Sequence, residues 1–278
     1  MRVRPFADAP DFLAHIGPAL AGRELHNDLL LGVVRELIRR PDPSACMLSI
    51  DEAGRPVLAA VMSPPLDLVL STGDPTAIGD LIDHLCRHGP QVPGVFSFAP
   101  MAEAFADAWR VRTGQAVAPG LEMRLYALAD IPPPDSTPGS LRCARPGDRT
   151  LLGEWTSAFF AEAGLSDQER QVRVAEVGDH IDRGTLYVWE LDGAIVSMAV
   201  FRDTTPTSAR IGPVYTPPTL RGRGYATACV RHLSRQLLSS GRKWCLLFAD
   251  TDNPTSTGIY RRLGYQDVGL YREYKFSP

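Results

Sequence analysis

Cysteine is scarce in this chain and follows no ligating pattern. The 278 residues contain five cysteines, an odd number, and no two of them form a C-x-x-C pair. The spacing therefore favours neither a zinc site nor a disulfide framework, and it predicts reduced thiols in a cytoplasmic protein without a bound metal. The five are Cys46, Cys86, Cys143, Cys229 and Cys245.

Long apolar runs and a surplus of one charge are also missing. No stretch approaches the roughly 20 apolar residues that a membrane span needs, and the first residues lack the apolar run of a signal peptide. The chain has 29 lysines and arginines against 32 aspartates and glutamates, a net charge of −3. We therefore expect a cytoplasmic protein that has neither nucleic acid nor a membrane as its partner.

The sequence does contain an α/β pattern in two parts. Apolar residues at helical spacing, as in residues 24–39, alternate with short apolar runs such as residues 56–62. Residues 131–139 are rich in proline and have no apolar face, which predicts a linker. The length suffices for two cores. We expect one domain over residues 1–130 and a second over residues 140–278.

The most informative stretch is residues 212–226, which read GPVYTPPTLRGRGYA. The stretch begins as a strand, breaks at Pro217 and Pro218, and reaches Gly222 and Gly224 just before a helix. Glycine lets backbone N–H groups approach a ligand closely, and the first turn of a helix has N–H groups without internal partners. Together with the helix dipole these groups predict a phosphate pocket, although a plain strand-to-helix turn has the same pattern.

The segments after this stretch bear a family resemblance. A helix follows, then an apolar run at residues 244–249, then a short helix closed by a glycine in the position of a C-cap. Two motifs in this order resemble the GCN5-related N-acetyltransferase (GNAT) superfamily, over about residues 140–276. The acyl-CoA signature is matched by Arg221, Gly224 and Ala226, and the later motif by Asn253, Pro254, Ile259, Tyr260, Gly264 and Tyr265.

The resemblance implies an N-acetyltransferase that moves an acetyl group from acetyl-CoA, its co-substrate, to a primary amine of a small molecule or peptide by direct transfer. The implied fold is a mixed, mostly antiparallel twisted sheet flanked by helices. Tyr260 takes the position of the family's general acid, and Asn253 that of a contact to the pantetheine arm. The other implied cofactor-binding residues are Val214, Tyr215 and Thr216 along the pantetheine, and Arg221, Gly222, Arg223, Gly224, Tyr225 and Ala226 around the pyrophosphate.

A general base does not stand out. The strand before the pyrophosphate turn has no carboxylate, and a water relay is one alternative. His180 and His232, on predicted helices, are more typical of solvated residues. The carboxylates that stay open are Glu154, Glu162, Glu190 and Asp250. For the acceptor we expect a site with the aromatic and acidic side chains that suit a cationic amine, drawn from Phe159, Phe160, Glu162, Tyr271, Glu273 and Tyr274.

The two halves show the same order of predicted elements, which indicates an internal duplication. In the first half, residues 71–76 stand at the place of the phosphate pocket, but they have no arginine and one glycine, and Asp74 would repel a diphosphate. Trp109 lies near the place of Tyr260. We therefore predict a degenerate GNAT-like first half that binds no acyl-CoA. An unrelated α/β domain is the alternative.

Two other functions agree with the same residues. One is a mycothiol-synthase-like acetyltransferase, which also pairs an inert half with an active one. The other is a non-catalytic acyl-CoA-binding or sensing protein, for which the glycine turn would suffice without Tyr260 and Asn253. The sequence leaves the acceptor amine open, and it leaves a monomer and a homodimer open as well.

Overall fold

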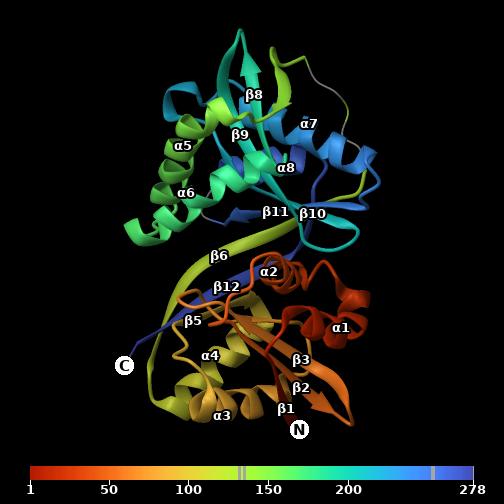
Figure 1. Cartoon of the computed structure of the whole chain (residues 1–278), viewed down its shortest axis with the longest axis vertical. Helices are drawn as coiled ribbons and strands as arrows, with labels where there is room; N and C mark the ends of the chain where they lie inside the picture. The colour runs from red at the N-terminus through yellow and green to blue at the C-terminus, as the bar shows by residue number, and fades with distance from the viewer. Residues whose placement is uncertain (131–132, 134–135, 252–253, 278) are drawn as a thin grey trace. The chain divides into compact units, whose positions relative to one another are not determined.

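The chain contains the same succession of elements twice (Figure 1). A computed structural model describes residues 1–130, 133, 136–251 and 254–277. Each half runs strand, two helices, three strands, helix, strand, helix, strand, with short 3₁₀ turns between some of these elements. The element order that the sequence predicts for both halves is therefore present in the structure.

The elements are as follows. The first half comprises β1 (Arg2–Phe6), α1 (Ala9–Leu20), η1 (Ala21–Arg23), α2 (Asp28–Arg39), β2 (Cys46–Glu52), β3 (Arg55–Met62), β4 (Val69–Leu70), η2 (Pro75–Ala77), α3 (Ile78–His88), β5 (Gly94–Phe98), α4 (Ala99–Thr113) and β6 (Ala116–Leu128). The second half comprises β7 (Ser140–Cys143), η3 (Pro146–Asp148), α5 (Arg149–Glu162), α6 (Asp167–Asp182), β8 (Leu186–Leu191), β9 (Ala194–Asp203), β10 (Ser208–Tyr215), η4 (Pro218–Leu220), α7 (Tyr225–Ser239), β11 (Trp244–Asp250), α8 (Pro254–Arg262) and β12 (Gln266–Ser277).

The structure divides into two compact units whose limits differ from the predicted domains. The predicted second domain, residues 140–278, includes β12. In the structure, nearly all of β12 belongs to the first unit. The first unit contains Met1–Tyr126, Phe248–Pro254 and Asp267–Pro278, and the second contains Ala127–Leu247 and Thr255–Gln266.

In the first unit the sheet begins with β1, β2, β3 and β4, which pair antiparallel in that order. Leu68 continues the sheet through a parallel bridge to Val95 in β5. β12 then pairs antiparallel with β5 through residues 271–275, and β6 follows β12. The last strand of the chain thus lies inside the sheet of the first unit.

Alternating side chains of β3 fill two cores, one on each face of this sheet. Ala59 and Val61 belong to the core that α1 and α2 cover, whereas Leu58 and Ala60 belong to the core that α3 and α4 cover. Figure 1 shows the two helix pairs on opposite faces. The period of two along a strand explains why the continuous apolar run at residues 56–62 is buried on both sides.

In the second unit the strands follow the order β7, β8, β9, β10 and β11, and the first four pair antiparallel. β10 and β11 run parallel, but their register covers only Ser208–Arg210 opposite Trp244–Leu246. An irregularity between Ile211 and Val214 follows in β10. Within the described ranges the end of β10 therefore has a ladder partner only in β9.

Helices cover both faces of this second sheet as well. α5 and α6 share a buried core with β8, β9 and β10, in which Leu152, Val177 and Val188 are representative. α7 packs on β8, β9 and β10 through the apolar side that includes Cys229 and Leu233. In neither unit is a helix of the described ranges long and apolar enough to cross a membrane.

Two local signals have the predicted structure, and one strand escaped prediction. Asp192 and Gly193 both have positive φ, 49° and 78°, as a two-residue hairpin turn between β8 and β9 requires. Gly264 has a φ of 93°, and it closes α8. β1 was not predicted, because its sequence RVRPF contains two arginines and a proline and none of its residues is fully buried.

Candidate active site

The predicted phosphate turn lies between η4 and α7, directly after the end of β10. Gly222 and Gly224 have φ values of 76° and 82°, which lie in the left-handed region that favours glycine. A Cβ on Gly222 would meet no atom within 4 Å, and one on Gly224 would come no closer than 3.8 Å, to the Thr137 Oγ1 atom. The turn therefore has a glycine backbone with open space in front of it.

The backbone donors of this turn are available. In the described part of the chain, the N–H groups of Gly222, Arg223, Gly224 and Tyr225 donate no hydrogen bond. The first α-helical bond at this end runs from the Ala228 N–H to the Gly224 carbonyl, at 2.9 Å. Open N–H groups at a helix start, together with the helix dipole, favour an anion.

The two predicted cations are placed differently. Arg223 is exposed and forms no ion pair within the described ranges. The Arg221 side chain turns back, so that its Nε donates to the Thr216 carbonyl at 2.9 Å and its Nη2 lies 2.8 and 2.7 Å from the two carboxylate oxygens of Glu162. Both side chains of this ion pair are about half exposed, at 46% and 48%. Such a pair contributes at most about 1 kcal/mol, so a phosphate could replace Glu162 at little cost.

The predicted pantetheine strand is the end of β10. Val214 lies opposite Ala199 of β9, and Tyr215 and Thr216 are buried. Ser197 Oγ donates to the Tyr215 carbonyl at 3.1 Å and accepts from Thr216 Oγ1 at 2.9 Å. These contacts fix the strand end from the β9 side and leave the opposite edge without β11.

A cation, an anion and a ring meet where α5 ends against β10. The Arg221 guanidinium lies 5.6 Å from the centre of the Tyr215 ring, and the Tyr215 hydroxyl lies 3.4 Å from Glu162 Oε1. Burial and the neighbouring Glu162 carboxylate raise the pKa of Tyr215. Of the four carboxylates proposed as bases, Glu162 is thus held at the end of the predicted pantetheine strand.

Tyr260 lies in α8, close to the end of that helix. Its carbonyl accepts from the Tyr265 N–H at 3.1 Å while Gly264 N–H donates to Arg261, which is the Schellman arrangement of a helix C-terminus. The rings of Tyr260 and Tyr265 lie 6.0 Å apart. Burial raises the pKa of Tyr260 to about 12. Asn253, the other residue predicted here, lies outside the described residues.

The remaining candidate bases are mostly engaged elsewhere. Glu190 Oε2 lies 2.5 Å from Arg142 Nε, and Glu154 is exposed on α5. His180 is buried, contrary to the expectation of a solvated residue. Its Nδ1 lies 2.8 Å from Thr185 Oγ1. His232 packs against the Trp189 ring at 4.9 Å. A group of three side chains able to hold a metal is absent from the described ranges.

Part of the predicted acceptor site belongs to the first unit instead. Tyr271 is buried and its hydroxyl donates to the His26 carbonyl at 2.7 Å. Glu273 accepts from the Leu121 N–H at 3.0 Å and pairs with Lys275 at 3.0 Å. Since β12 is a sheet strand of the first unit, these side chains have structural partners there. Their role in selecting the acceptor stays a prediction.

Arg202 is a residue of the site region that sequence reasoning missed. Its Nη1 donates to the Gly212 carbonyl at 2.8 Å, in the irregular part of β10, and its Nη2 lies 3.3 Å from Glu176 and 3.1 Å from His180 Nε2. Arg202 therefore ties the irregular strand to α6. The sequence does not indicate this role, because an arginine next to an aspartate at the end of a strand is typical of a solvated residue.

In the counterpart of the phosphate turn in the first half, most of the N–H groups already donate within the protein. Ser71 N–H donates to the Ala59 carbonyl at 2.8 Å, and Asp74 N–H donates to the Val57 carbonyl at 2.9 Å. A Cβ on Gly73 would lie 2.1 Å from the Val57 carbonyl oxygen, so the loop rests directly on β3. Asp74 accepts from the Thr76 N–H at 2.8 Å and thus stands where an anion would bind.

Residues 150–265 match the model of the acetyltransferase (GNAT) family. The second half of the chain thus matches the GNAT family, and the chain as a whole has the mixed α/β fold, with mostly antiparallel sheets, of solved GNAT proteins. GNAT acetyltransferases as a family take the acetyl group from acetyl-CoA and pass it to amine acceptors.

Individual relatives show how far the similarity extends. The chain is 25% identical over 234 residues to the mycothiol acetyltransferase of Mycolicibacterium smegmatis, which covers 75% of this chain and 78% of the relative. A GNAT-family acetyltransferase from Colwellia psychrerythraea shares the fold over 100% of both chains, with a TM-score of 0.65 at 12% identity. A tandem GNAT protein from the clavulanic acid biosynthesis pathway shares it over 100% of this chain and 99% of its own, with a TM-score of 0.60 at 14% identity.

Proposed function

We propose that the protein is an N-acetyltransferase that moves the acetyl group of acetyl-CoA directly to a primary amine of a small molecule or peptide. The second half would carry the reaction, and the degenerate first half would not bind acetyl-CoA. One observation supports this most: the glycine turn before α7 has open N–H groups at residues 222–225, whereas in its counterpart the N–H groups of Ser71, Thr72 and Asp74 donate within the protein.

The cofactor would lie along the end of β10 and on the turn. The pyrophosphate would accept hydrogen bonds from the N–H groups of residues 222–225, and Arg223 would add a positive charge. The pantetheine arm would pair with residues 214–216 as an added strand does, because β11 does not occupy that edge. Arg221 would either exchange Glu162 for a phosphate or stay on Tyr215 and brace the strand end.

The transfer itself would need little beyond alignment of the two reactants. The amine nitrogen attacks the thioester carbonyl carbon, a C–N bond forms and the C–S bond breaks. One proton leaves the nitrogen for a base or a water, and the thiolate of CoA takes one from an acid. Holding the amine against the thioester supplies much of the rate by proximity.

Tyr260 is the acid that we propose for the thiolate. With a pKa of about 12 it keeps its proton at neutral pH, but transfer of that proton to the thiolate of a thiol with the ordinary pKa of about 8.5 would be uphill by about 5 kcal/mol. The same dry surroundings would make the leaving thiolate more basic. Burial has this effect on thiols within the protein, since it raises the pKa of Cys229 to about 12. The proposal therefore requires that the site shields the leaving thiolate from water.

Glu162 is our candidate for the residue that attracts a cationic acceptor. It ends α5 beside Phe159 and Phe160, and its Oε1 lies 3.4 Å from the hydroxyl of Tyr215 in the predicted pantetheine strand. If a phosphate took over Arg221, the Glu162 carboxylate would be left with Tyr215 and without its cation. An ammonium group of the acceptor would then replace the lost charge.

Two alternatives remain as second candidates. A mycothiol-synthase-like activity is favoured by the name of the curated relative, at 25% identity. A non-catalytic acyl-CoA-binding protein would need the turn but not the proton donor Tyr260. Consumption of bound acetyl-CoA distinguishes an enzyme from a binding protein. The amine that is acetylated distinguishes the two enzyme activities.

A panel of amines with acetyl-CoA tests the proposal. Aminosugars, polyamines and lysine peptides would be offered singly, with free thiol measured against time and the product identified by mass spectrometry. We expect at least one class to release thiol far faster than the Gly224→Glu variant does. If acetyl-CoA binds but no amine exceeds that blank, the protein is a binding module and the proposed activity is wrong.

A further inference from the structure

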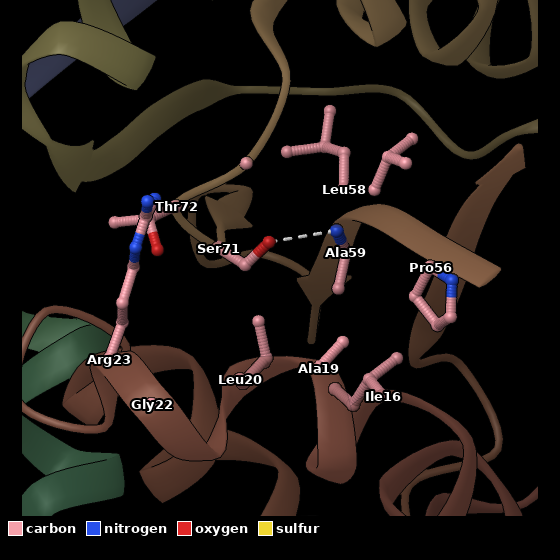
Figure 2. A pocket seen from close by; sticks show the side chains of 12 residues that line it. Ile16, Ala19, Leu20, Gly22, Arg23, Pro56, Leu58, Ala59, Ser71 and Thr72 are labelled. Atoms are coloured by element: carbon pink, nitrogen blue, oxygen red, sulfur yellow. Dashed lines mark hydrogen bonds between the residues drawn. The ribbon is translucent and has the colours of Figure 1, made fainter.

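The first unit contains a cavity of about 340 Å³ that the proposed acetyl transfer does not use (Figure 2). Its floor comes from α1 and η1, and its roof from β3 and the loop after β4. The volume lies at the lower end of the roughly 300–1,000 Å³ that small-molecule sites have. The cavity can therefore hold one small ligand.

The lining combines apolar walls with a single charge. Ile16 and Leu20 of α1 and Ala59 of β3 are apolar and buried. Arg23 is the one ionisable side chain among the lining residues. It forms no ion pair within the described ranges, and Figure 2 shows it extending from η1 toward the loop that carries Thr72. A guanidinium at the mouth of an apolar cavity is complementary to a ligand that has an anionic head group and an apolar body.

The cavity is held open by a buried amide. Asn27, only 1% exposed, accepts from the Thr72 N–H at 2.7 Å through Oδ1. Its Nδ2 donates to Thr72 Oγ1 and to the Arg23 carbonyl, each at 3.0 Å. One side chain thus joins η1 to the loop opposite, and the backbone at the mouth of the cavity is fixed before any ligand arrives. Preorganisation of this kind lowers the entropic cost of binding.

The loop also restricts the head group. The N–H groups of Ser71, Thr72 and Asp74 donate within the protein, and the Asp74 carboxylate stands at the start of η2. A diphosphate would find neither a nest of open donors nor a second cation here. A single carboxylate, in contrast, can be bound by one guanidinium, whose planar group donates two parallel hydrogen bonds to the two carboxylate oxygens.

We propose that this cavity binds a small monocarboxylate with an apolar body, with its carboxylate on Arg23 and its body against Ile16, Leu20 and Ala59. The Ser71 hydroxyl accepts from the Ala59 N–H at 2.9 Å, which leaves its own proton as a further donor at the roof. The first half of the chain is then a ligand-binding unit that has replaced a diphosphate-bearing ligand by a smaller, singly charged one.

Calorimetric titration of the full chain with octanoate tests this proposal, with octanol as the neutral probe of equal length. We expect saturable binding of octanoate, at one site, and binding of octanol at least about tenfold weaker. Arg23→Gln is expected to weaken octanoate about 10- to 100-fold, the worth of a charge-assisted hydrogen bond. Arg110→Gln removes an equally exposed guanidinium of the same unit, on α4, and should change nothing.

A second variant tests the cavity without its charge. Ala19 is exposed on α1 and lines the cavity, so Ala19→Leu should fill it and weaken octanoate by a similar factor. Ala14→Leu, at an exposed alanine of the same helix that does not line the cavity, is the matched control. Absence of saturable octanoate binding, or equal binding by wild type, Arg23→Gln and Ala19→Leu, would overturn the proposal. So would CoA binding that Arg23→Gln abolishes. Acetyl transfer is not needed for either readout, so the outcome is independent of the proposed activity.

Discussion

Tyr260 is the single side chain on which the proposed chemistry depends most. Tyr260→Phe keeps the ring and its packing and removes only the transferable proton. We expect kcat to fall about 10²–10⁴-fold, the usual worth of a general acid, while the affinity for acetyl-CoA stays nearly unchanged. Steady-state kinetics with the amine found in the panel, together with calorimetry, measures both quantities.

Tyr265→Phe is the matched control for that variant. The Tyr265 hydroxyl lies 2.8 Å from Ser234 Oγ in the core, so its loss should lower the free energy of unfolding by about 1 kcal/mol and leave kcat within about twofold. If Tyr260→Phe behaves like Tyr265→Phe, with near-normal kcat, then Tyr260 is a packing residue.

The pH dependence of kcat gives a second test of Tyr260 as the general acid. The acid works only in its protonated form, and burial raises the pKa of Tyr260 to about 12. The protonated fraction therefore stays close to one as pH rises through 9 and 10. We expect kcat to show no alkaline fall below about pH 11. A fall centred near pH 9 or 10 would show that another group supplies the proton.

Asp67 gives a prediction about stability. Burial raises the pKa of Asp67 to about 6, although the hydrogen bond from Lys275 lowers it, and Oδ1 has no partner among the described residues. A folded-state pKa above the unfolded value of about 3.8 means that stability falls as pH rises through 4 to 6. Asp67→Asn mimics the protonated form. We expect it to raise the free energy of unfolding by up to about 3 kcal/mol at pH 8 and by much less at pH 4.

Urea unfolding at the two pH values measures this difference. Asp107→Asn, at an exposed carboxylate that is 75% accessible and pairs only with Arg110 among the described residues, is the control. Equal effects of Asp67→Asn at both pH values would show that the Asp67 carboxylate is not strained by its burial.

At the scale of elements, the glycine turn before α7 carries the prediction. Gly224→Glu places a carboxylate where the diphosphate would bind, and the open space around Gly224 accommodates the side chain. We expect acetyl-CoA binding to be lost while the chain stays folded. Calorimetry for the affinity, with circular dichroism for the fold, separates the two effects.

The other end of the same helix provides the control for that variant. Gly241 follows α7, has a φ of 97° and also has open space around it, so Gly241→Glu imposes the same left-handed strain. It should lower stability by about as much, on the order of 1 kcal/mol, and leave acetyl-CoA affinity unchanged. Equal affinity of both variants would remove the phosphate role of the turn.

Elements were more predictable than contacts between them. The helical spacing of residues 226–237 and the Asp192–Gly193 turn depend on neighbours within one element, so periodicity and positive φ were enough. The pairing of Arg221 with Glu162 joins residues 59 positions apart, and nothing local indicates it. For the same reason the sequence does not indicate the bonds of Tyr271 to His26 and of Glu273 to Leu121, since these partners lie in the other half of the sequence.

At the scale of the whole molecule, the contrast between the two turns predicts the number of cofactor sites. The second half has open donors and Arg223, and the first has mostly occupied donors and Asp74. Like charges at close range would cost several kcal/mol, enough to remove a micromolar affinity. We expect one acetyl-CoA per chain, measured by calorimetry on the wild type, and none in Gly224→Glu. Two sites, or one site that survives in Gly224→Glu, would contradict this assignment.

The place of β12 decides when the first half can finish folding during synthesis. β5 receives its antiparallel neighbour from residues 271–275, which are translated after all the other strands described here. While the second half is being translated, that edge of β5 has unpaired backbone groups open to any passing strand. The first half is translated first, but its sheet is therefore completed only when β12 has been made. A chain released before β12 would expose an unpaired strand edge that can pair with other chains, and its first half would not be an independent domain.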